Sequence, residues 1–308
     1  MVDEQQRRQA AHEDGSGASS ADRDATTADE IAPIVTPAAR PLGFWPGLPY
    51  AERPEGGLRL DVLAPAGPDG RTGQAGGPVP GASARPLAPV VVFLHGGGWH
   101  EGDRGAALHP WLNPLLAARG FVTVAPTYRL SGTAVWPAAL EDARAAVVWT
   151  IEHAEEFGGD PARVGVWGFS AGAQLAALVA LEASSGVRAA AVAACPADLR
   201  SADIAGDNEV TRLLGVPATP ERLAALSAVT LVRAPTVPFS IVHGTADEIV
   251  PFWQGVALRD ALRAAGGIAE WHAVEGGRHS WADTPSAGLD EGAPSFGSLA
   301  ADFFERML

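Results

Sequence analysis

Residues 163–172 read RVGVWGFSAG and carry the chain from an apolar run into a helix-forming stretch at Ser170. The run 163–167 is short, continuous and apolar, as is typical of a buried strand. Residues 171–184 are rich in alanine and leucine, which favours a helix. The stretch therefore predicts a strand, a tight turn and a helix, with the serine at the turn.

Glycines flank this serine on both sides. Gly168 stands two residues before it and Gly172 two residues after it, so the backbone can adopt the strained angles of a sharp turn. Such a turn raises the hydroxyl of Ser170 above the sheet edge, beside the amide of Ala171 at a helix N-terminus. This is the geometry of a nucleophile next to a donor for an oxyanion. The pentapeptide alone is a weak signal, because 36 of the 308 residues are glycine.

Apolar runs and helical stretches alternate along the rest of the chain. Continuous apolar runs indicate strands buried on both faces of a mostly parallel sheet with helices on each side, which is an α/β fold. Further strands are expected at 90–94, 121–125, 187–194, 238–242 and 268–274, and an alternating strand at 58–63. Further helices are expected at 105–119, 137–157, 251–265 and 295–307. Right-handed crossovers then bring the carboxyl ends of the strands to one edge.

The N-terminal part of the chain differs from this regular pattern. Residues 1–30 are polar and acidic, which predicts a disordered tail ahead of one domain at 31–308. Within that domain, the proline-rich stretch 31–54 predicts an extended arm laid on the surface. The glycine- and proline-rich stretch 64–88 predicts a long surface loop.

Residues 196–235 interrupt the alternation of strands and helices. The segment lacks a clear strand and holds two short helical stretches, 208–215 and 219–227. We expect it to form a small lid-like excursion over the strand ends. Its small size favours an open, shallow pocket.

Composition excludes several classes of protein. The net charge is −14 and no basic stripe is visible, so we expect no nucleic-acid partner. Every basic residue is arginine, which excludes a Schiff-base lysine and a Ser–Lys pair. The single cysteine, Cys195, allows no intrachain disulfide. With no apolar stretch of membrane-spanning length and no secretory leader, we expect no membrane association and a cytoplasmic location.

A run of three glycines follows the strand expected at 90–94. It lies in the sequence His95-Gly96-Gly97-Gly98-Trp99. Consecutive glycines let the amides of Gly97 and Gly98 point into one concavity, where they form an oxyanion hole together with the amide of Ala171. We interpret His95 as a buried residue that supports this loop by hydrogen bonding.

A carboxylate and a histidine follow the last two expected strands. The loop 243–251 offers Asp247 and Glu248 as the acid that orients a histidine. Asp247 is favoured, because Glu248 can instead charge the first turn of the next helix. Asp198 follows another strand and is a reserve candidate. His279, in the glycine-rich loop after the final strand, is the candidate general base.

The candidates occur in the order Ser170, Asp247, His279, which is the α/β-hydrolase order and differs from that of the two common serine-protease classes. Over residues 50–308 the chain resembles the α/β-hydrolase esterases and lipases, specifically the BD-FAE and hormone-sensitive-lipase-like carboxylesterases. The resemblance rests on HGGGW at 95–99, FGGDP at 157–161, GFSAG at 168–172, HGTADEIVP at 243–251 and GGRHSW at 276–281.

The resemblance implies hydrolysis of small acyl or aryl carboxylic esters through an acyl-serine intermediate, with no metal and no organic cofactor. The partner it implies is a small-molecule ester substrate. Arylformamidases, which cleave N-formylkynurenine, share nearly the same motifs, so an arylformamidase or small amidase is the alternative. The third glycine, Gly98, favours the esterase, because arylformamidases often carry a bulkier residue there. A non-catalytic, ligand-binding homologue is a further alternative.

Aromatic side chains near these loops are candidates for the substrate pocket. Trp99, Trp253 and Trp281 flank the oxyanion, acid and histidine loops, and aromatic walls suit acyl or aryl groups. Nine tryptophans in an α/β core also serve for packing. The sequence leaves the natural substrate and the oligomeric state open, a homo-oligomer included.

Overall fold

The computed structural model describes residues 41–66, 86–110, 112–201, 208–279 and 295–308, all within one structural unit. The expected tail at 1–30 and most of the loop at 64–88 lie outside the described residues. Among the described helices, none combines the length and the hydrophobicity needed to cross a lipid bilayer.

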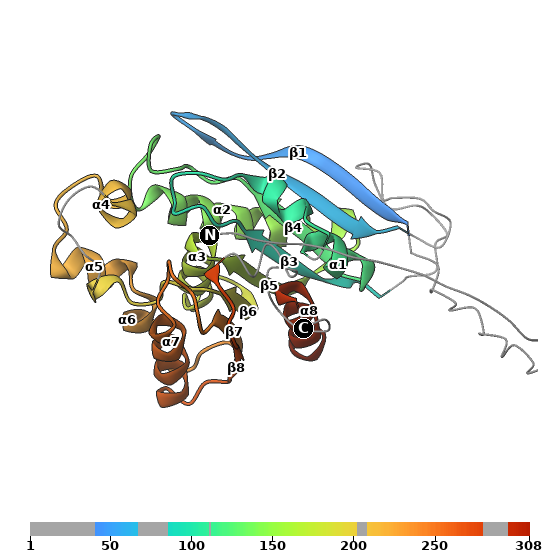
Figure 1. The fold of residues 1–308 in the computed structure, drawn as a ribbon. Coiled ribbons are helices and arrows are strands. Elements are labelled where there is room, and N and C mark those ends of the chain that lie inside the picture. The colour runs from blue at the N-terminus through green and yellow to red at the C-terminus, as the bar shows by residue number, and fades with distance from the viewer. Residues whose placement is uncertain (1–40, 67–85, 111, 202–207, 280–294) are drawn as a thin grey trace, which may run out of the picture. The chain divides into compact units, whose positions relative to one another are not determined.

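An eight-stranded sheet organises the fold (Figure 1), with strand order β1-β2-β4-β3-β5-β6-β7-β8. The strands β3 to β8 run parallel to one another, and β2 pairs antiparallel with both β1 and β4. The strands are β1 (Leu42–Arg53), β2 (Gly56–Pro65), β3 (Ala88–Leu94), β4 (Val122–Pro126), β5 (Gly159–Phe169), β6 (Val187–Ala193), β7 (Phe239–Gly244) and β8 (Ala269–Val274).

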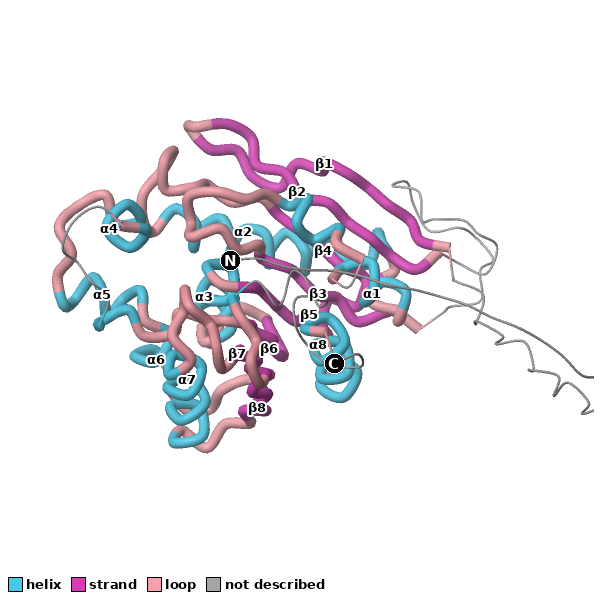
Figure 2. The backbone as a smooth tube through the Cα atoms, in the orientation of Figure 1, coloured by secondary structure: helices cyan, strands magenta, loops and turns pink. Residues whose placement is uncertain are grey.

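Helices cover both faces of this sheet (Figure 2). On one face α2 (Ala138–His153), α3 (Ala171–Ala180) and α7 (Trp253–Ala264) contribute to one apolar core. On the other face α1 (Asn113–Ala118) and α8 (Phe296–Met307) form a second core. Because both faces are covered, the central strands are continuous apolar runs. The predicted mostly parallel sheet with helices on both faces is confirmed.

The extended arm expected at 31–54 is, in its described part, an edge strand. Residues Leu42–Arg53 form β1 and pair with β2. The register shifts between Trp45 and Leu48 and again between Pro49 and Ala51. Proline cannot donate to the ladder, so it is tolerated in an edge strand at such irregularities. Because the prolines interrupt the pattern of a strand, the sequence did not indicate one. The expectation of an arm was wrong over Leu42–Arg53.

The helix expected at 105–119 is divided in two. A short 3₁₀ helix η1 (Arg104–Leu108) precedes α1, and His109 between them is extended, with φ −56° and ψ 133°. His109 precedes Pro110, and the residue before a proline avoids helical angles. Two further helices end earlier than expected. The α-helix α2 ends at His153 and is followed by the 3₁₀ helix η2 (Ala154–Phe157), and α3 ends at Ala180.

The expected excursion between β6 and β7 is present. Its helices are η3 (Leu199–Ser201), α4 (Glu209–Leu214), α5 (Pro220–Leu226) and α6 (Ala228–Leu231). The α4 helix starts at a capping box, in which the side chain of Asn208 accepts from the amides of Val210 and Thr211. The α5 helix starts with Thr219 as its cap and a proline in its first turn. The two predicted helical stretches match α4 and α5.

The strand order reverses at β3, and this reversal positions the site. From β3 the chain continues to β4 on one side and later returns to β5 on the other, with Leu94 paired to Gly168. Ligands of open α/β sheets bind at the carboxyl ends of strands where the order reverses. The loop after β3 and the turn after β5 therefore meet where a ligand site is expected.

Candidate active site

The turn after β5 holds Ser170 in a backbone conformation that L-residues rarely adopt. Its φ is 53° and its ψ is −121°. The turn is tight, because a side-chain carbon on Gly168 would collide with the carbonyl of Gly172. The amide of Ser170 donates to the carbonyl of Ala193 at 2.9 Å, which ties the turn to β6. This combination of positive φ and close packing is the signature of a nucleophile elbow.

The side chains of Ser170, His279 and Asp247 form a continuous chain of hydrogen bonds. The Nε2 atom of His279 lies 3.0 Å from the Oγ of Ser170. Its Nδ1 atom lies 2.9 Å and 3.0 Å from the two carboxylate oxygens of Asp247. The three residues follow β5, β8 and β7, which is why residues 109 positions apart in sequence can meet.

The acid loop holds the carboxylate of Asp247 with further donors. Its Oδ1 atom accepts from the amides of Ile249 at 2.9 Å and Val250 at 2.8 Å. The Nε2 atom of His243 lies 3.5 Å from Oδ2 and 2.9 Å from the carbonyl of Val250. Burial by itself raises the pKa of Asp247, but the bonds from His243, His279 and the Val250 amide outweigh it and hold this pKa well below its usual range. The carboxylate is therefore ionised at neutral pH.

The other candidate acids have different partners. The carboxylate of Glu248 accepts from the backbone amide of His279 at 3.3 Å and pairs with Arg278 at 3.1 Å. It therefore holds the histidine loop. The sequence suggested that Glu248 charges the first turn of the next helix, but α7 begins only at Trp253 and has no acidic residue in its first turn. The carboxylate of Asp198 pairs with Arg200 at 2.7 Å. Neither carboxylate contacts the ring of His279, so Asp247 is the acid that the fold brings to it.

The histidine loop is anchored to the acid loop and to β5. The amide of Ala246 donates to the carbonyl of Gly277 at 3.0 Å, and that of Gly276 donates to Oγ1 of Thr245 at 2.9 Å. The ring of Phe169 packs against the ring of His279, with centroids 5.0 Å apart. The imidazole is thus oriented both by hydrogen bonds and by an aromatic neighbour.

The glycine loop after β3 turns tightly beside Ser170. The amides of His100 and Glu101 both donate to the carbonyl of Gly97 at 3.0 Å. Gly97 and Gly98 have φ values of 115° and 55°. Within the described part of the chain, no protein acceptor is bonded to the amides of Gly97, Gly98 or Ala171. These donors are therefore available to an oxygen atom that is not part of the protein.

The helix α3 lies directly against this glycine loop. A side-chain carbon on Gly172 would collide with the carbonyl oxygens of Leu94 and His95, at the end of β3. The glycine thus permits the N-terminus of α3 to lie against the start of the loop. The amide of Ala171 in that first turn has no intrahelical acceptor.

His95 supports the glycine loop from below. Its ring is buried and stacks on Tyr128 with centroids 4.2 Å apart, and its Nδ1 donates to the carbonyl of Gly96 at 2.7 Å. The hydroxyl of Tyr128 donates to the carbonyl of His95 at 2.8 Å. Burial lowers the pKa of His95, so the ring stays neutral. This agrees with the supporting role that the sequence indicated.

The three tryptophans expected to line the pocket differ in position. Trp99 is 5% exposed and belongs to the apolar core, and its expected place in the substrate pocket stays a prediction. The residue has φ 62°, a value uncommon for a residue with a side chain, and its indole nitrogen bonds to Gln174. Trp253 is 43% exposed at the start of α7, and no contact places it against Ser170. Trp281 lies outside the described residues.

Two residues of the site were not recognised from the sequence. His243 lies in the acid loop four residues before Asp247, and nothing in the sequence alone indicates its contact with that carboxylate. Gln174, one turn after Ser170, is fully buried and hydrogen-bonded at both amide atoms. A buried glutamine in an alanine- and leucine-rich helix was the available signal for the second residue.

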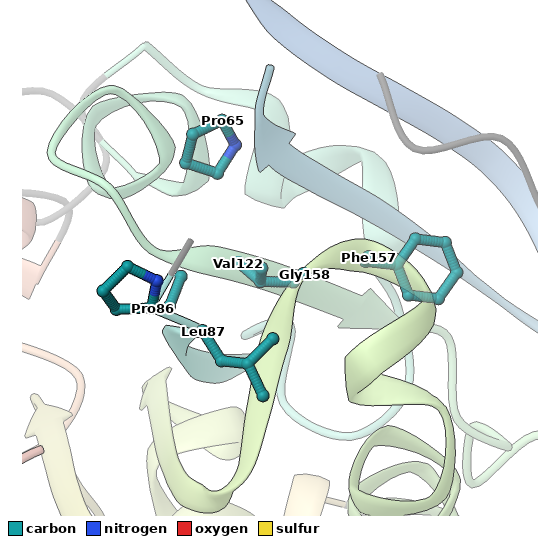
Figure 3. A pocket seen from close by; sticks show the side chains of 7 residues that line it. Pro65, Pro86, Leu87, Val122, Phe157 and Gly158 are labelled. Atoms are coloured by element: carbon teal, nitrogen blue, oxygen red, sulfur yellow. The ribbon is translucent and has the colours of Figure 1, made fainter. Parts of the chain in front are cut away.

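Other parts of the described molecule offer less chemistry. Figure 3 shows a small pocket whose lining includes Pro65, Leu87, Val122 and Phe157. It lies at the amino ends of β3 and β4, and its described lining holds no ionisable side chain. Among the described residues, no group of three potential ligands is arranged to hold a metal ion.

The fold and these loops define a class. A mostly parallel eight-stranded sheet with helices on both faces, and a serine on a strained turn between a central strand and its helix, is the α/β-hydrolase fold. The chain belongs to the BD-FAE family, whose family model matches residues 79–262, more than half of the chain. The predicted family is confirmed.

Curated relatives and solved structures agree with this assignment. The chain is 31% identical to esterase LipQ of Mycobacterium tuberculosis over 58% of its own length and 47% of the relative's. It is 32% identical to the probable carboxylic ester hydrolase LipM of the same organism, over 57% and 45%. The chain spans about half the length of the curated relatives it matches.

Among solved structures, the apo form of Thermogutta terrifontis esterase 2 has a TM-score of 0.66 and 27% identity, covering 87% of this chain and 95% of that chain. A truncated carbohydrate esterase from gut microbiota has a TM-score of 0.65 over 86% of this chain and 96% of that chain. The second likeness, at 21% identity, shows the fold alone.

Proposed function

We propose that the protein is a serine hydrolase that cleaves small carboxylic esters through an acyl-serine intermediate. The observation that carries the proposal is the hydrogen-bonded chain from Ser170 through His279 to Asp247. The amides of Gly97, Gly98 and Ala171, which have no acceptor among the described residues, accompany it. Relatives named as esterases and carboxylic ester hydrolases support the same reaction class.

In the first half of the reaction, Oγ of Ser170 attacks the ester carbonyl carbon while its proton passes to Nε2 of His279. The ring is then an imidazolium, which the ionised carboxylate of Asp247 stabilises through Nδ1–H. The same Nε2–H protonates the leaving alkoxide oxygen as the carbon–oxygen bond breaks. An alcohol departs and the acyl group remains on Ser170.

The second half repeats these steps with water. His279 takes a proton from the water, whose oxygen attacks the acyl carbon, and returns it to Oγ of Ser170 as the carboxylic acid leaves. In both halves the carbonyl oxygen becomes negatively charged. The amides of Gly97, Gly98 and Ala171 are the donors for this oxyanion, and donors fixed before the reaction stabilise it without reorganisation.

Short acyl groups are the proposed substrate class. Structures of Thermogutta terrifontis esterase 2 were solved with butyrate and with propionate bound, at 26% and 25% identity to this chain. The excursion between β6 and β7 is built from short helices, which favours an open site over a deep tunnel for long chains. Formamide hydrolysis is the competing reaction, because the same nucleophile and donors serve it.

The test compares rates on p-nitrophenyl acetate, p-nitrophenyl octanoate and N-formylkynurenine, with Ser170→Ala as the control. We expect fast acetate cleavage that falls by about 10³-fold or more in the variant, because the hydroxyl is the nucleophile. Activity confined to N-formylkynurenine would move the protein to the arylformamidases. Unchanged esterase activity in Ser170→Ala would contradict the proposed mechanism. A folded wild type that is inactive on all three substrates would favour a ligand-binding protein.

A further inference from the structure

Gln174 occupies an unusual place in the nucleophile helix. It lies one turn after Ser170 on α3, and its amide donates to the carbonyl of Ser170 at 3.1 Å. The side chain has no exposed surface. A glutamine buried in an apolar core is stable only when its polar atoms are bonded. Both of its side-chain amide atoms have partners, and the two partners belong to different parts of the site.

The first partner is the glycine loop after β3. The Nε1 atom of Trp99 donates to the Oε1 of Gln174 at 3.1 Å. Trp99 directly follows Gly98, and its own carbonyl accepts from the amide of Ser131 at 2.8 Å. The residue is therefore fixed at its backbone by the segment after β4 and at its side chain by α3. Because Gly97 and Gly98 have no side chains, Trp99 is their nearest anchor to the core.

The second partner is the excursion between β6 and β7. The Nε2 atom of Gln174 donates to the carbonyl of Leu226 at 2.8 Å. Leu226 is the last residue of α5, where a carbonyl group lacks an intrahelical donor. The next residue, Ser227, is also tied down, because its Oγ accepts from the amide of Leu199 at 2.9 Å and donates to the carbonyl of Leu223 at 2.7 Å.

We infer that Gln174 is a positioning residue for the oxyanion donors. It fixes the loop carrying Gly97 and Gly98 to the same helix that begins at the nucleophile, so that only one helical turn separates Ser170 from the loop's anchor. The bond to Leu226 holds the glutamine amide in the orientation that accepts from Trp99. The inference rests on the proposed function, because it assigns a step of ester hydrolysis to this contact.

The test uses Trp99→Phe, Gln174→Met and the double variant. Trp99→Phe removes the indole donor and keeps an aromatic ring, whereas Gln174→Met keeps the length of the side chain and removes both polar atoms. We expect kcat on p-nitrophenyl acetate to fall about tenfold in Gln174→Met with KM within about threefold, because a displaced donor costs less than a deleted one. Affinity for a trifluoromethyl ketone, which forms a tetrahedral adduct on the serine, should fall by the same factor as kcat.

Gln254→Met is the matched control. Gln254 on α7 is also buried, at 6% exposure, and its side chain also makes two hydrogen bonds. Its Oε1 accepts from the amide of Asp198 at 2.6 Å, and its Nε2 donates to the carbonyl of Asp198 at 2.9 Å. It contacts the excursion but not the glycine loop. The melting temperature should fall as in Gln174→Met, while kcat stays within about twofold of wild type.

The double variant separates one shared contact from two independent ones. If Trp99 and Gln174 act through their mutual bond, the double variant loses little more kcat than Gln174→Met alone. Losses that multiply would overturn the inference, as would wild-type kcat in both single variants. If Gln174→Met fails to fold, Trp99→Phe still tests the bond between Trp99 and Gln174, because it leaves the bond between Gln174 and Leu226 in place. If the wild type has no esterase activity, both the proposed function and the inference are wrong. If the variants are as active as an active wild type, only the inference is wrong.

Discussion

Two buried aspartates of this protein have very different partners. Asp142 on α2 has no exposed side-chain surface and binds two arginines, with Arg53 and Arg129 each at 2.8 Å. Asp247 is 1% exposed and binds no arginine. Its donors are the ring of His279 and two backbone amides, with His243 at 3.5 Å. The side chains of the two carboxylates are almost equally buried, yet only Asp142 is paired with guanidinium groups.

The difference separates a structural carboxylate from one suited to catalysis. Fixed cations neutralise Asp142, and its bonds with Arg53 and Arg129 join α2 to β1 and to the segment after β4. Hydrogen bonds from imidazole rings and a backbone amide lower the pKa of Asp247 and keep it ionised without pairing it with a guanidinium group. That charge remains available to stabilise a proton arriving on His279. The type of partner, more than burial, indicates which aspartate is suited to the proposed reaction.

Asp247→Asn should produce the largest effect. Asparagine has nearly the same shape but lacks the charge, and it can present an amide donor to Nδ1 that favours the wrong tautomer of His279. We expect kcat to fall about 10⁴-fold. The measurement is p-nitrophenyl acetate hydrolysis by a variant shown by circular dichroism to be folded. A variant that keeps a tenth or more of the wild-type kcat would contradict this prediction, because that activity is roughly 10³ times the expected one. It would mean that Asp247 is structural, like Asp142.

Asp142→Asn should reverse that pattern. Removing the carboxylate leaves two poorly exposed guanidinium groups without their shared partner, although Glu55 and Glu141 still contact Arg129 at 3.4 Å and 3.2 Å. We expect the free energy of unfolding to fall by about 3 kcal/mol, with kcat/KM of the folded variant within about threefold of wild type. Urea unfolding and ester hydrolysis measure the two quantities. A large loss of kcat/KM without a loss of stability would contradict the distinction drawn here.

The acid dependence of stability should show a smaller difference between wild type and Asp247→Asn. The folded pKa of Asp247 is below its ordinary value of 3.8. The contribution of this carboxylate to stability is therefore complete above the unfolded pKa and is lost as the pH falls towards the folded one. Urea unfolding between about pH 6 and pH 3 should show that the free energy of unfolding falls more steeply with decreasing pH in wild type than in Asp247→Asn. Parallel curves would mean that the pKa of Asp247 is the same in both states.

Local patterns in the sequence were sufficient for most of the architecture. Continuous apolar runs marked the central strands β3 to β7 because both faces of the sheet are covered there, and this requirement is visible in each run separately. The strand β1 escaped recognition because Pro46 and Pro49 interrupt its pattern, and only its pairing with β2 shows that the irregularities are tolerated. The break before Pro110 is a local effect, because a proline disfavours helical angles at the residue before it.

The candidate site was predictable in part for the same reason. Ser170, Asp247 and His279 could each be placed after a strand, and parallel strands bring such positions to one edge. The inward position of Trp99 could not be predicted, because it depends on a partner, Gln174, that lies 75 residues further along the chain. The catalytic roles of the three residues remain predictions for the experiments above.

The sequence by itself determined the strand–turn–helix around Ser170 and the order of the elements, because glycine spacing and hydrophobic periodicity act over a few neighbouring residues. The sequence favoured Asp247 over Glu248, but only the tertiary structure shows that the carboxylate of Asp247 reaches the ring of His279 and that Trp99 is an anchor of the glycine loop. These choices depend on contacts between loops brought together by the strand order. The physical reason is that a hydrogen bond requires both partners in place, and no local pattern encodes the position of the second.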